Sequence, residues 1–155
     1  MSTHEDFLQL VAAAKLAGDP NELTRAIPYV RFMGITLVHE RHELIGKMAF
    51  APSLVGNPTL PALHGGTLGA LMECTAIFEL LWNSHLGGVP KIINITVDYL
   101  RSGKPRDTFA RAEVRKLGRR VAAVHVTAWQ EDRDDPITTA HCHFLVAPSA
   151  IQPDL

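Results

Sequence analysis

Apolar and polar positions follow two different rhythms along this chain. From residue 67 to 82 apolar side chains occur on nearly every side of an expected helix, with no proline and with Glu73 and Glu79 as the only charged residues. A helix that is apolar all round is normally enclosed by other structure. The two acids are six residues apart and therefore lie on different faces. We expect one at the boundary of the core and the other in solvent.

Elsewhere the apolar positions alternate with polar ones, as in half-buried strands. Two strands precede the long helix and join at a turn at Arg41–His42, and a β-rich pattern returns after Pro90. This order predicts an α+β fold in which a curved antiparallel sheet wraps around the helix. Such a sheet covers one side of the helix only, so we expect two-fold self-association to bury the rest. The expected strands are 34–40, 43–50, 91–101, 109–117, 121–130 and 137–146, with Ile93, Ile95, Val97 and Tyr99 sharing one face.

The first 29 residues read as a helical arm. Thr3 is placed to cap a helix with Asp6 at its third position, and apolar residues follow at helical spacing from Phe7 until Gly18-Asp19-Pro20 ends the helix. A short second helix is expected at 22–26 before Pro28. The expected organisation is an arm (1–29), one main domain (30–147) and a tail (148–155).

The segment 57–66 reads as a loop, because Pro58 and Pro61 interrupt it and Gly65-Gly66 closes it. It delivers backbone N–H groups to the start of the long helix, where orphan donors and a partial positive charge can hold a carbonyl oxygen that becomes negative. Glu73 lies roughly 12 Å further along the axis than Gly65. If the two act on one atom, a second chain must bring its own helix alongside.

These residues carry a resemblance. Asn57, His64-Gly65-Gly66 and Glu73, followed by the strand Asn94–Arg101 and the turn Gly118-Arg119-Arg120, resemble the hotdog-fold acyl-CoA thioesterases of the phenylacetate-pathway (PaaI-like) type over about residues 30–147. The resemblance implies an acidic catalyst at Glu73, an oxyanion donor at the Gly65 amide, and Asn57 holding the water or the thioester across a dimer interface. Glu rather than Asp at position 73 resembles the branch that acts on aryl-CoA. Relatives often carry Ser or Thr where this chain has Ile77 and Ile92.

Composition narrows the class of protein. At 155 residues, 46% apolar and with a net charge of −1, the chain is the size of one globular domain and is not a general polyanion binder. The acidic N-terminus lacks the features of a signal peptide, and residues 68–82 are too short to span a bilayer. Cys74 and Cys142 form no motif. We expect a cytoplasmic protein with reduced thiols and without membrane or nucleic-acid partners.

Charge is concentrated in residues 101–120, where eight basic residues face only Asp107 and Glu113, a net charge of +6. A compact group of Arg and Lys suits the phosphates of coenzyme A. It would suit RNA nearly as well, but Tyr99 and Phe109 are the only aromatic residues nearby. We therefore assign CoA binding to Gly66, Arg101, Lys104, Arg106, Arg119 and Arg120, and expect no further cofactor because CoA is part of the substrate.

Each candidate residue also has a structural interpretation. Glu73 is either the catalyst or a solvated residue on a helix edge, and burial in an apolar pocket would make it a better base. His64 is either an acid–base group or a residue that orients the loop through a backbone hydrogen bond. Asn57 is either part of the site or the stabiliser of a turn before Pro58.

The histidines and Cys74 are two further candidates for a functional role. His141 and His143 share a strand face, and His125 and His39 are the candidates for a third metal ligand there. The sequence places neither of them at that face, so no metal is expected. Cys74 adjoins Glu73 in sequence, yet helical neighbours point about 100° apart, so it is interpreted as a core residue.

The sequence thus predicts a hotdog-fold acyl-CoA thioesterase, dimeric or tetrameric, with catalytic residues Glu73, Gly65, Asn57 and His64. The enzymatic alternative is a hotdog acyl-CoA hydratase or dehydratase that uses His64. The non-enzymatic alternative is an acyl-CoA-binding sensor, which would require a DNA-reading helix pair ahead of the fold. Acyl preference and the base or nucleophile role of Glu73 stay open.

Overall fold

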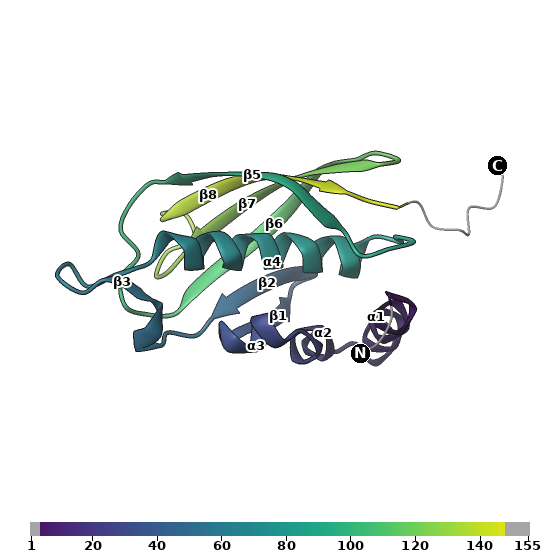
Figure 1. Ribbon diagram of the computed structural model, residues 1–155, viewed down its shortest axis with the longest axis horizontal. Coiled ribbons are helices and arrows are strands. Elements are labelled where there is room, and N and C mark those ends of the chain that lie inside the picture. Colours follow the sequence, from purple (N-terminus) through teal and green to yellow (C-terminus); the bar gives the residue numbers. More distant parts are fainter. Residues whose placement is uncertain (1–3, 148–155) are drawn as a thin grey trace.

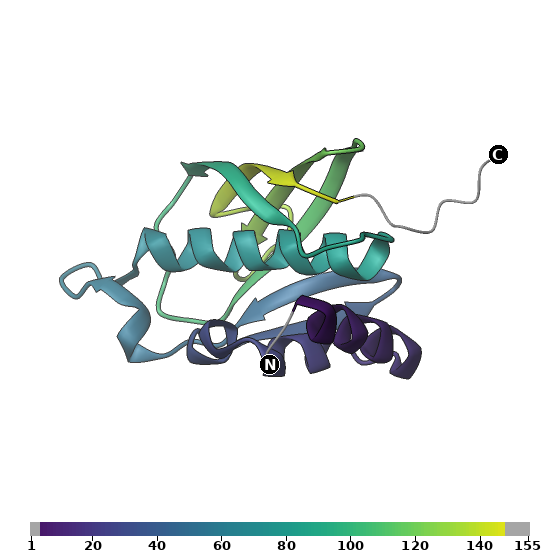
Figure 2. The same cartoon turned by 45° about the vertical axis from the view of Figure 1, so that its right-hand side comes forward.

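The computed structural model describes residues 4–147, and its architecture is the predicted one. Helix α4 (Gly65–Asn83) lies along the inner side of a curved, six-stranded antiparallel sheet (Figures 1 and 2). The fold is therefore the hotdog fold, and the predicted class is confirmed. In spatial order the strands are β1 (Ile35–Glu40), β2 (Glu43–Met48), β6 (Thr108–Leu117), β7 (Val121–Trp129), β8 (Thr138–Leu145) and β5 (Lys91–Tyr99).

A 3-10 turn and two short strands precede α4, in the segment expected to be irregular. The turn η1 (Pro52–Leu54) leads into β3 (Val55–Asn57), which pairs with β4 (Ala62–Leu63) as a separate two-stranded sheet. The α-helix itself begins at Gly65, so the Gly pair forms its first turn rather than the end of the loop.

Small side chains on the inner face of the sheet let α4 lie close to it. Ala110, Ala122, Ala128 and Ala140 are fully buried there. On β2 a Cβ atom at Gly46 would lie 2.2 Å from Thr75 Oγ1 of α4, so only glycine fits at this crossing. The close approach fixes the rotation of α4 and hence the faces on which its two acids lie.

Both acids of α4 are partly buried, so the expectation that one would be in solvent is wrong. Glu79 accepts a hydrogen bond from Asn83 Nδ2 at 2.7 Å, and burial raises its pKa. Glu73 lies in a pocket on another face of the helix. The two carboxyl groups do occupy different environments, as their spacing predicts.

The β1–β2 hairpin turns at the two residues that the sequence indicates. Arg41 and His42 have φ angles of 49° and 67°, and Glu40 pairs with Glu43 across the turn. Two consecutive residues with positive φ match the twist of antiparallel strands, which is why two-residue hairpins use this conformation.

Strand β5 is the edge strand of the sheet, and it is irregular. Its pairing with β8 shifts register between Ile92 and Asn94, so Ile93 does not share a face with Ile95 and Val97 as expected. Only Ile95 and Val97 of its nine residues are partly buried. Ile93 is 56% exposed and Tyr99 is 55% exposed, which leaves an apolar edge open.

The N-terminal arm contains three helices rather than two: α1 (His4–Ala17), α2 (Asn21–Ala26) and α3 (Pro28–Phe32). The third was not predicted, because no helix was expected to follow Pro28, whereas proline suits the first position of a helix. Helix α3 crosses the predicted boundary at residue 29, and the division into arm, domain and tail stays a prediction. The cap expected at Thr3 and the tail 148–155 lie outside the described residues.

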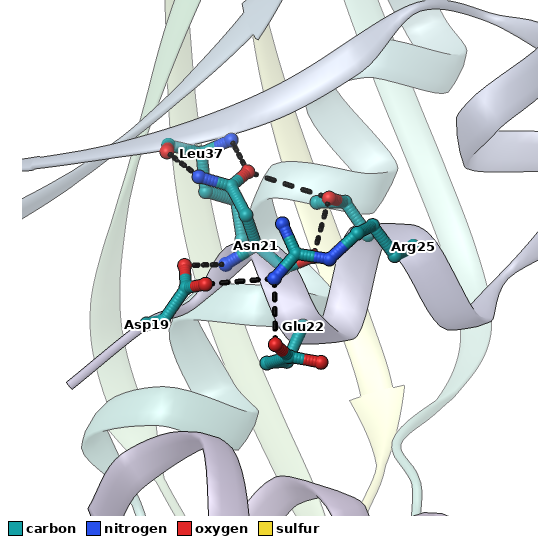
Figure 3. Close-up of polar contacts among 6 residues, drawn as sticks. Asp19, Asn21, Glu22, Arg25 and Leu37 are labelled. Atoms are coloured by element: carbon teal, nitrogen blue, oxygen red, sulfur yellow. Dashed lines mark hydrogen bonds and ion pairs between the residues drawn. The ribbon is translucent and has the colours of Figure 1, made fainter. Parts of the chain in front are cut away.

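One side chain of the arm, Asn21, hydrogen-bonds to the outer edge of β1 (Figure 3). Asn21 Nδ2 donates to the Leu37 carbonyl at 2.7 Å, and Asn21 Oδ1 accepts from the Leu37 N–H at 2.8 Å. The same helix carries Arg25, which pairs with Asp19 and Glu22 at 2.7 Å each. The Asn21 amide thus bonds to this edge as a neighbouring strand would.

Candidate active site

His64 is the N-cap of α4. Its Nδ1 accepts a hydrogen bond from the Gly66 N–H at 2.9 Å, and its carbonyl accepts from the Thr67 N–H and hydroxyl. A Cβ atom at Gly66 would lie 2.9 Å from this Nδ1, so glycine is needed for the cap. Because Nδ1 acts as an acceptor, His64 orients the loop, and a neutral ring carries its proton on Nε2.

The Gly65 amide is a free donor at the start of the helix. Its N–H has no acceptor within residues 4–147, whereas its carbonyl accepts a hydrogen bond from the Tyr99 hydroxyl at 2.9 Å. A Cβ atom at Gly65 would lie 2.9 Å from the Tyr99 ring, so the contact requires glycine. Tyr99 was not among the predicted site residues, since nothing in the sequence indicates its contact with a residue 34 positions earlier.

Glu73 lies in a pocket of about 330 Å³ between α4, β5 and α3. Its carboxylate makes no hydrogen bond or ion pair with the described residues. Burial raises the pKa of this carboxyl above its usual value of 4.5. The site therefore holds a carboxylate that is more basic than usual and is not engaged elsewhere. The pocket is lined by Tyr29, Gly66, Gly69, Ala70, Glu73, Cys74, Ile95 and Val97.

A second, more open hollow of about 600 Å³ adjoins this pocket at the helix start. Gly66 lines both, and Gly65, Tyr99 and Arg101 line the second. Gly65 and Glu73 are eight residues apart on one helix, or about 12 Å along its axis. The donor and the carboxylate of one chain therefore belong to neighbouring hollows and do not meet at one atom.

Asn57 stabilises the turn that follows it. Its Oδ1 accepts hydrogen bonds from the Thr59 N–H at 3.0 Å and the Leu60 N–H at 3.2 Å. The side chain is exposed at the end of β3. The structure therefore gives Asn57 the turn-stabilising role that the sequence left open, and only its amide Nδ2 is left for a ligand.

The basic residues of 101–120 do not form one cluster. Residues 101–106 follow β5 near the N-terminal end of α4, whereas Arg119 and Arg120 lie at the β6–β7 hairpin, at the other end of the molecule (Figure 1). Strand β6 separates the two groups with ten residues. The expectation of one compact cluster is wrong, because residues that are close in sequence lie far apart along an extended strand.

Several of these cations are paired with acids that the charge count in this window did not include. Arg101 pairs with Asp135 at 2.5 Å, Arg106 pairs with Glu131, and Arg111 pairs with Glu43 at 3.0 Å. Within residues 4–147, Lys104, Lys116, Arg119 and Arg120 form no ion pair. These four are the cations left for an anionic ligand.

The histidines and cysteines have ordinary structural environments. His125 and His141 stack with ring centroids 4.7 Å apart, and His143 Nδ1 lies 2.7 Å from Asn94 Oδ1. No set of three His, Cys, Asp or Glu side chains within residues 4–147 is arranged to hold a metal. Burial raises the pKa of the Cys74 thiol to about 12, so it is not a thiolate near neutral pH.

None of the helices in the described part of the chain has the length and apolar character needed to cross a membrane.

The chain belongs to the thioesterase superfamily, whose model matches residues 60–137. A Chromobacterium violaceum protein of known structure is 36% identical and superposes with a TM-score of 0.74, over 93% of this chain and 99% of that one. No curated protein matches the chain.

Two more distant solved structures share the fold. A phenylacetic acid degradation-related protein from Ralstonia eutropha is 18% identical, with a TM-score of 0.72 over 88% of this chain and 99% of that one. A Bacillus halodurans protein crystallised with CoA is 17% identical, with a TM-score of 0.69 over 94% of this chain and 93% of that one.

Proposed function

We propose that the protein is an acyl-CoA thioesterase that hydrolyses a thioester to the free acid and CoA. The observation that carries this proposal is the unpartnered, partly buried Glu73 in a pocket that adjoins a helix start with a free Gly65 N–H. Membership of the thioesterase superfamily supports the reaction class. The CoA bound to the Bacillus halodurans structure supports CoA as the thiol.

The chemistry requires a nucleophile and a donor for the developing oxyanion. In the proposed reaction, water deprotonated by Glu73, or the Glu73 carboxylate itself, adds to the thioester carbonyl carbon. The carbonyl oxygen takes up negative charge and accepts from the Gly65 N–H. The C–S bond then breaks, and CoA leaves as a thiolate that takes up a proton. If Glu73 attacks directly, water subsequently hydrolyses the acyl-enzyme anhydride.

The separation of Gly65 and Glu73 implies that two copies of the chain build each site. The open edge of β5, with exposed Ile93 and Tyr99, is the surface on which a second copy can continue the sheet by antiparallel pairing. A two-fold axis beside β5 reverses the partner's helix, so that Glu73 of the partner subunit approaches Gly65 of this chain. Asn57 Nδ2 then orients the water or the thioester from the loop.

The same symmetry offers a path for CoA. Reversal of the partner brings the partner's Arg119 and Arg120 to the end of the assembly at which Gly65 of this chain lies. We assign the CoA phosphates to these two cations together with Lys104, since none of them forms an ion pair within residues 4–147. Arg101 and Arg106 keep a supporting role beside the hollow, because both are paired with acids.

The test is thiol release from acetyl-, hexanoyl-, benzoyl-, phenylacetyl- and palmitoyl-CoA by the wild type and by Glu73→Gln. Glutamine keeps the size of the side chain and removes its charge. We expect turnover to fall by about three orders of magnitude or more while the fold and dimer mass stay unchanged. Glu79→Gln is the matched control, since it is a partly buried acid on the same helix outside both hollows, and it should keep nearly full activity.

An active Glu73→Gln protein would contradict the assignment of Glu73. Binding of CoA esters without cleavage of any of them would instead favour the hydratase or the sensor. A single turnover in H₂¹⁸O with enzyme in excess tests the nucleophile role of Glu73. Unlabelled acid together with ¹⁸O in the Glu73 carboxyl group requires an anhydride that water opens at the Glu73 carbon, whereas trapping of the acyl group on Glu73 by rapid quench would reveal an anhydride that water opens at the acyl carbon.

A further inference from the structure

One side chain joins the edge strand of the sheet to the start of α4. The Tyr99 hydroxyl donates to the Gly65 carbonyl at 2.9 Å, and within residues 4–147 no other hydrogen bond links β5 to α4. The ring lies against the same residue, since a Cβ atom at Gly65 would be 2.9 Å from the ring carbon that bears the hydroxyl. Tyr99 therefore contacts the first residue of α4 through both its ring and its hydroxyl.

The backbone on either side of Tyr99 is held in place. The Thr138 hydroxyl donates to the Asp98 carbonyl at 2.9 Å, and the Leu100 N–H donates to the Ile137 carbonyl at 2.9 Å. Tyr99 itself pairs with Thr138 in the register of β5 and β8. The Tyr99 hydroxyl thus projects from a fixed point of the sheet.

The start of α4 has few bonds to the rest of the chain. Helix ends fray, and the residue before α4 is anchored by its own N–H, which His64 donates to the Leu54 carbonyl at 2.8 Å. Gly65 itself is held from outside the helix by the Tyr99 hydroxyl. An oxyanion donor stabilises a transition state only if it is held within about 0.5 Å of its productive position. A bond that fixes Gly65 therefore bears directly on its free N–H.

We propose that Tyr99 is a positioning residue, whose hydroxyl fixes the Gly65 N–H relative to β5 and thereby relative to the second copy of the chain. This inference rests on the proposed thioesterase function and its two-chain site. In that site the Gly65 N–H and Glu73 of the partner subunit belong to different chains, so their separation depends on how each chain is held at the β5 edge. The hydroxyl proton is donated to Gly65, so Tyr99 acts through Gly65 and not on the substrate carbonyl.

The experiment measures kcat and KM for the thioester that the wild type cleaves fastest, in the wild type and in Tyr99→Phe. This substitution removes the hydroxyl and keeps the ring against Gly65. We expect kcat to fall about 3- to 12-fold, the effect of one neutral hydrogen bond. KM should stay within about twofold, because the donor acts on charge that develops in the transition state. Circular dichroism and sedimentation should show an unchanged fold and dimer.

Thr138→Val is the matched control. It removes a hydroxyl that also donates to a carbonyl at 2.9 Å, that of Asp98, the residue before Tyr99 on β5. This hydrogen bond does not reach α4, so kcat and KM should each stay within about twofold of the wild type.

Each other outcome decides against the inference. An unchanged kcat in Tyr99→Phe, or an equal loss in Thr138→Val, would show that the bond to Gly65 does not position the donor. A raised KM with an unchanged kcat would make Tyr99 a substrate contact, and a loss of the dimer would assign the effect to assembly. In these cases the thioesterase proposal stands, whereas a wild type that cleaves no thioester would overturn the proposed function and this inference with it.

Discussion

The two edge strands of the sheet, β1 and β5, differ in whether other parts of the chain cover their outer backbone groups. At β1 both backbone groups of Leu37 are bonded to the side-chain amide of Asn21, and the arm covers the edge (Figure 3). At β5 no strand within residues 4–147 pairs with the outer edge, and Ile93 and Tyr99 are exposed on it. One edge is closed within the chain, and the other is open.

The candidate site lies beside the open edge. Tyr99, the last residue of β5, bonds to Gly65, and Ile95 and Val97 line the pocket of Glu73. The open edge is therefore the surface at which the proposed dimer would form, beside the candidate site.

Of the changes that probe the two edges of the sheet, blocking the open edge should have the largest effect. Ile93→Lys places a charge on the exposed β5 edge, as natural edge strands do to prevent pairing. The protein should become monomeric in sedimentation, and thioester turnover should fall by about 100-fold or more, because Gly65 and Glu73 of different chains no longer meet. A fully active monomer would show that one chain holds the whole site.

The second-largest effect is expected from removing the two hairpin cations that we assign to the CoA phosphates. Arg119→Ala combined with Arg120→Ala should raise KM for acyl-CoA by about 100-fold or more, because each of the two lost charge-assisted hydrogen bonds costs about 1.5–3 kcal/mol. KM for the matching N-acetylcysteamine thioester, which lacks the phosphates, should not change. Equal changes in both substrates would place CoA elsewhere.

Opening the closed edge should affect stability rather than catalysis. Asn21→Ala removes two hydrogen bonds to Leu37 and should lower the free energy of unfolding by about 1–3 kcal/mol in urea titrations, with little loss of activity. Glu22→Ala on the same helix removes only an exposed ion pair and should cost about 0–1 kcal/mol. Equal costs for the two variants would mean that the Asn21 amide does not hold the arm.

The smallest effect is in the pH dependence. The carboxyl of Glu73 has its pKa raised by burial, so kcat/KM should decline on the acid side with a midpoint above 4.5. The folded protein then binds this proton more tightly than the unfolded chain. Stability supplied by Glu73 is thus present below pH 4.5 and is lost as the pH rises through the higher folded pKa. Glu73→Gln should flatten this part of the stability profile, and Glu79→Gln should leave the acid limb of the rate in place.

Much of the fold could be predicted because it depends on local patterns. The apolar run at 67–82 identified α4, and period-two alternation located the six main strands. The errors arose where one residue type serves two purposes. Pro28 opens α3 instead of ending a helix, and Gly65 starts α4 instead of closing a loop. The bulge at Ile93 could not be predicted either, because the sequence around it alternates as in a regular strand.

The site was harder to predict because it depends on contacts between distant segments. His64, Gly65 and Glu73 follow one another along the chain, so their spacing could be interpreted directly. Tyr99 and Tyr29 reach the site from β5 and α3, and nothing near them in the sequence indicates this. The prediction of one compact basic cluster in residues 101–120 was wrong for the same reason, since Arg101 and Arg119 are separated by the whole length of β6.

The closed β1 edge limits how many copies can join. In the vocabulary of polymer chemistry, a sheet with two open edges is a bifunctional monomer, which adds at both ends and grows without limit. Closure of one edge by Asn21 makes the described chain monofunctional, with β5 as its only reactive end. A monofunctional unit that pairs with itself terminates at the first bond. Asn21 and the arm that it bonds to β1 thus act as a chain stopper, which leaves the β5 edge for pairing.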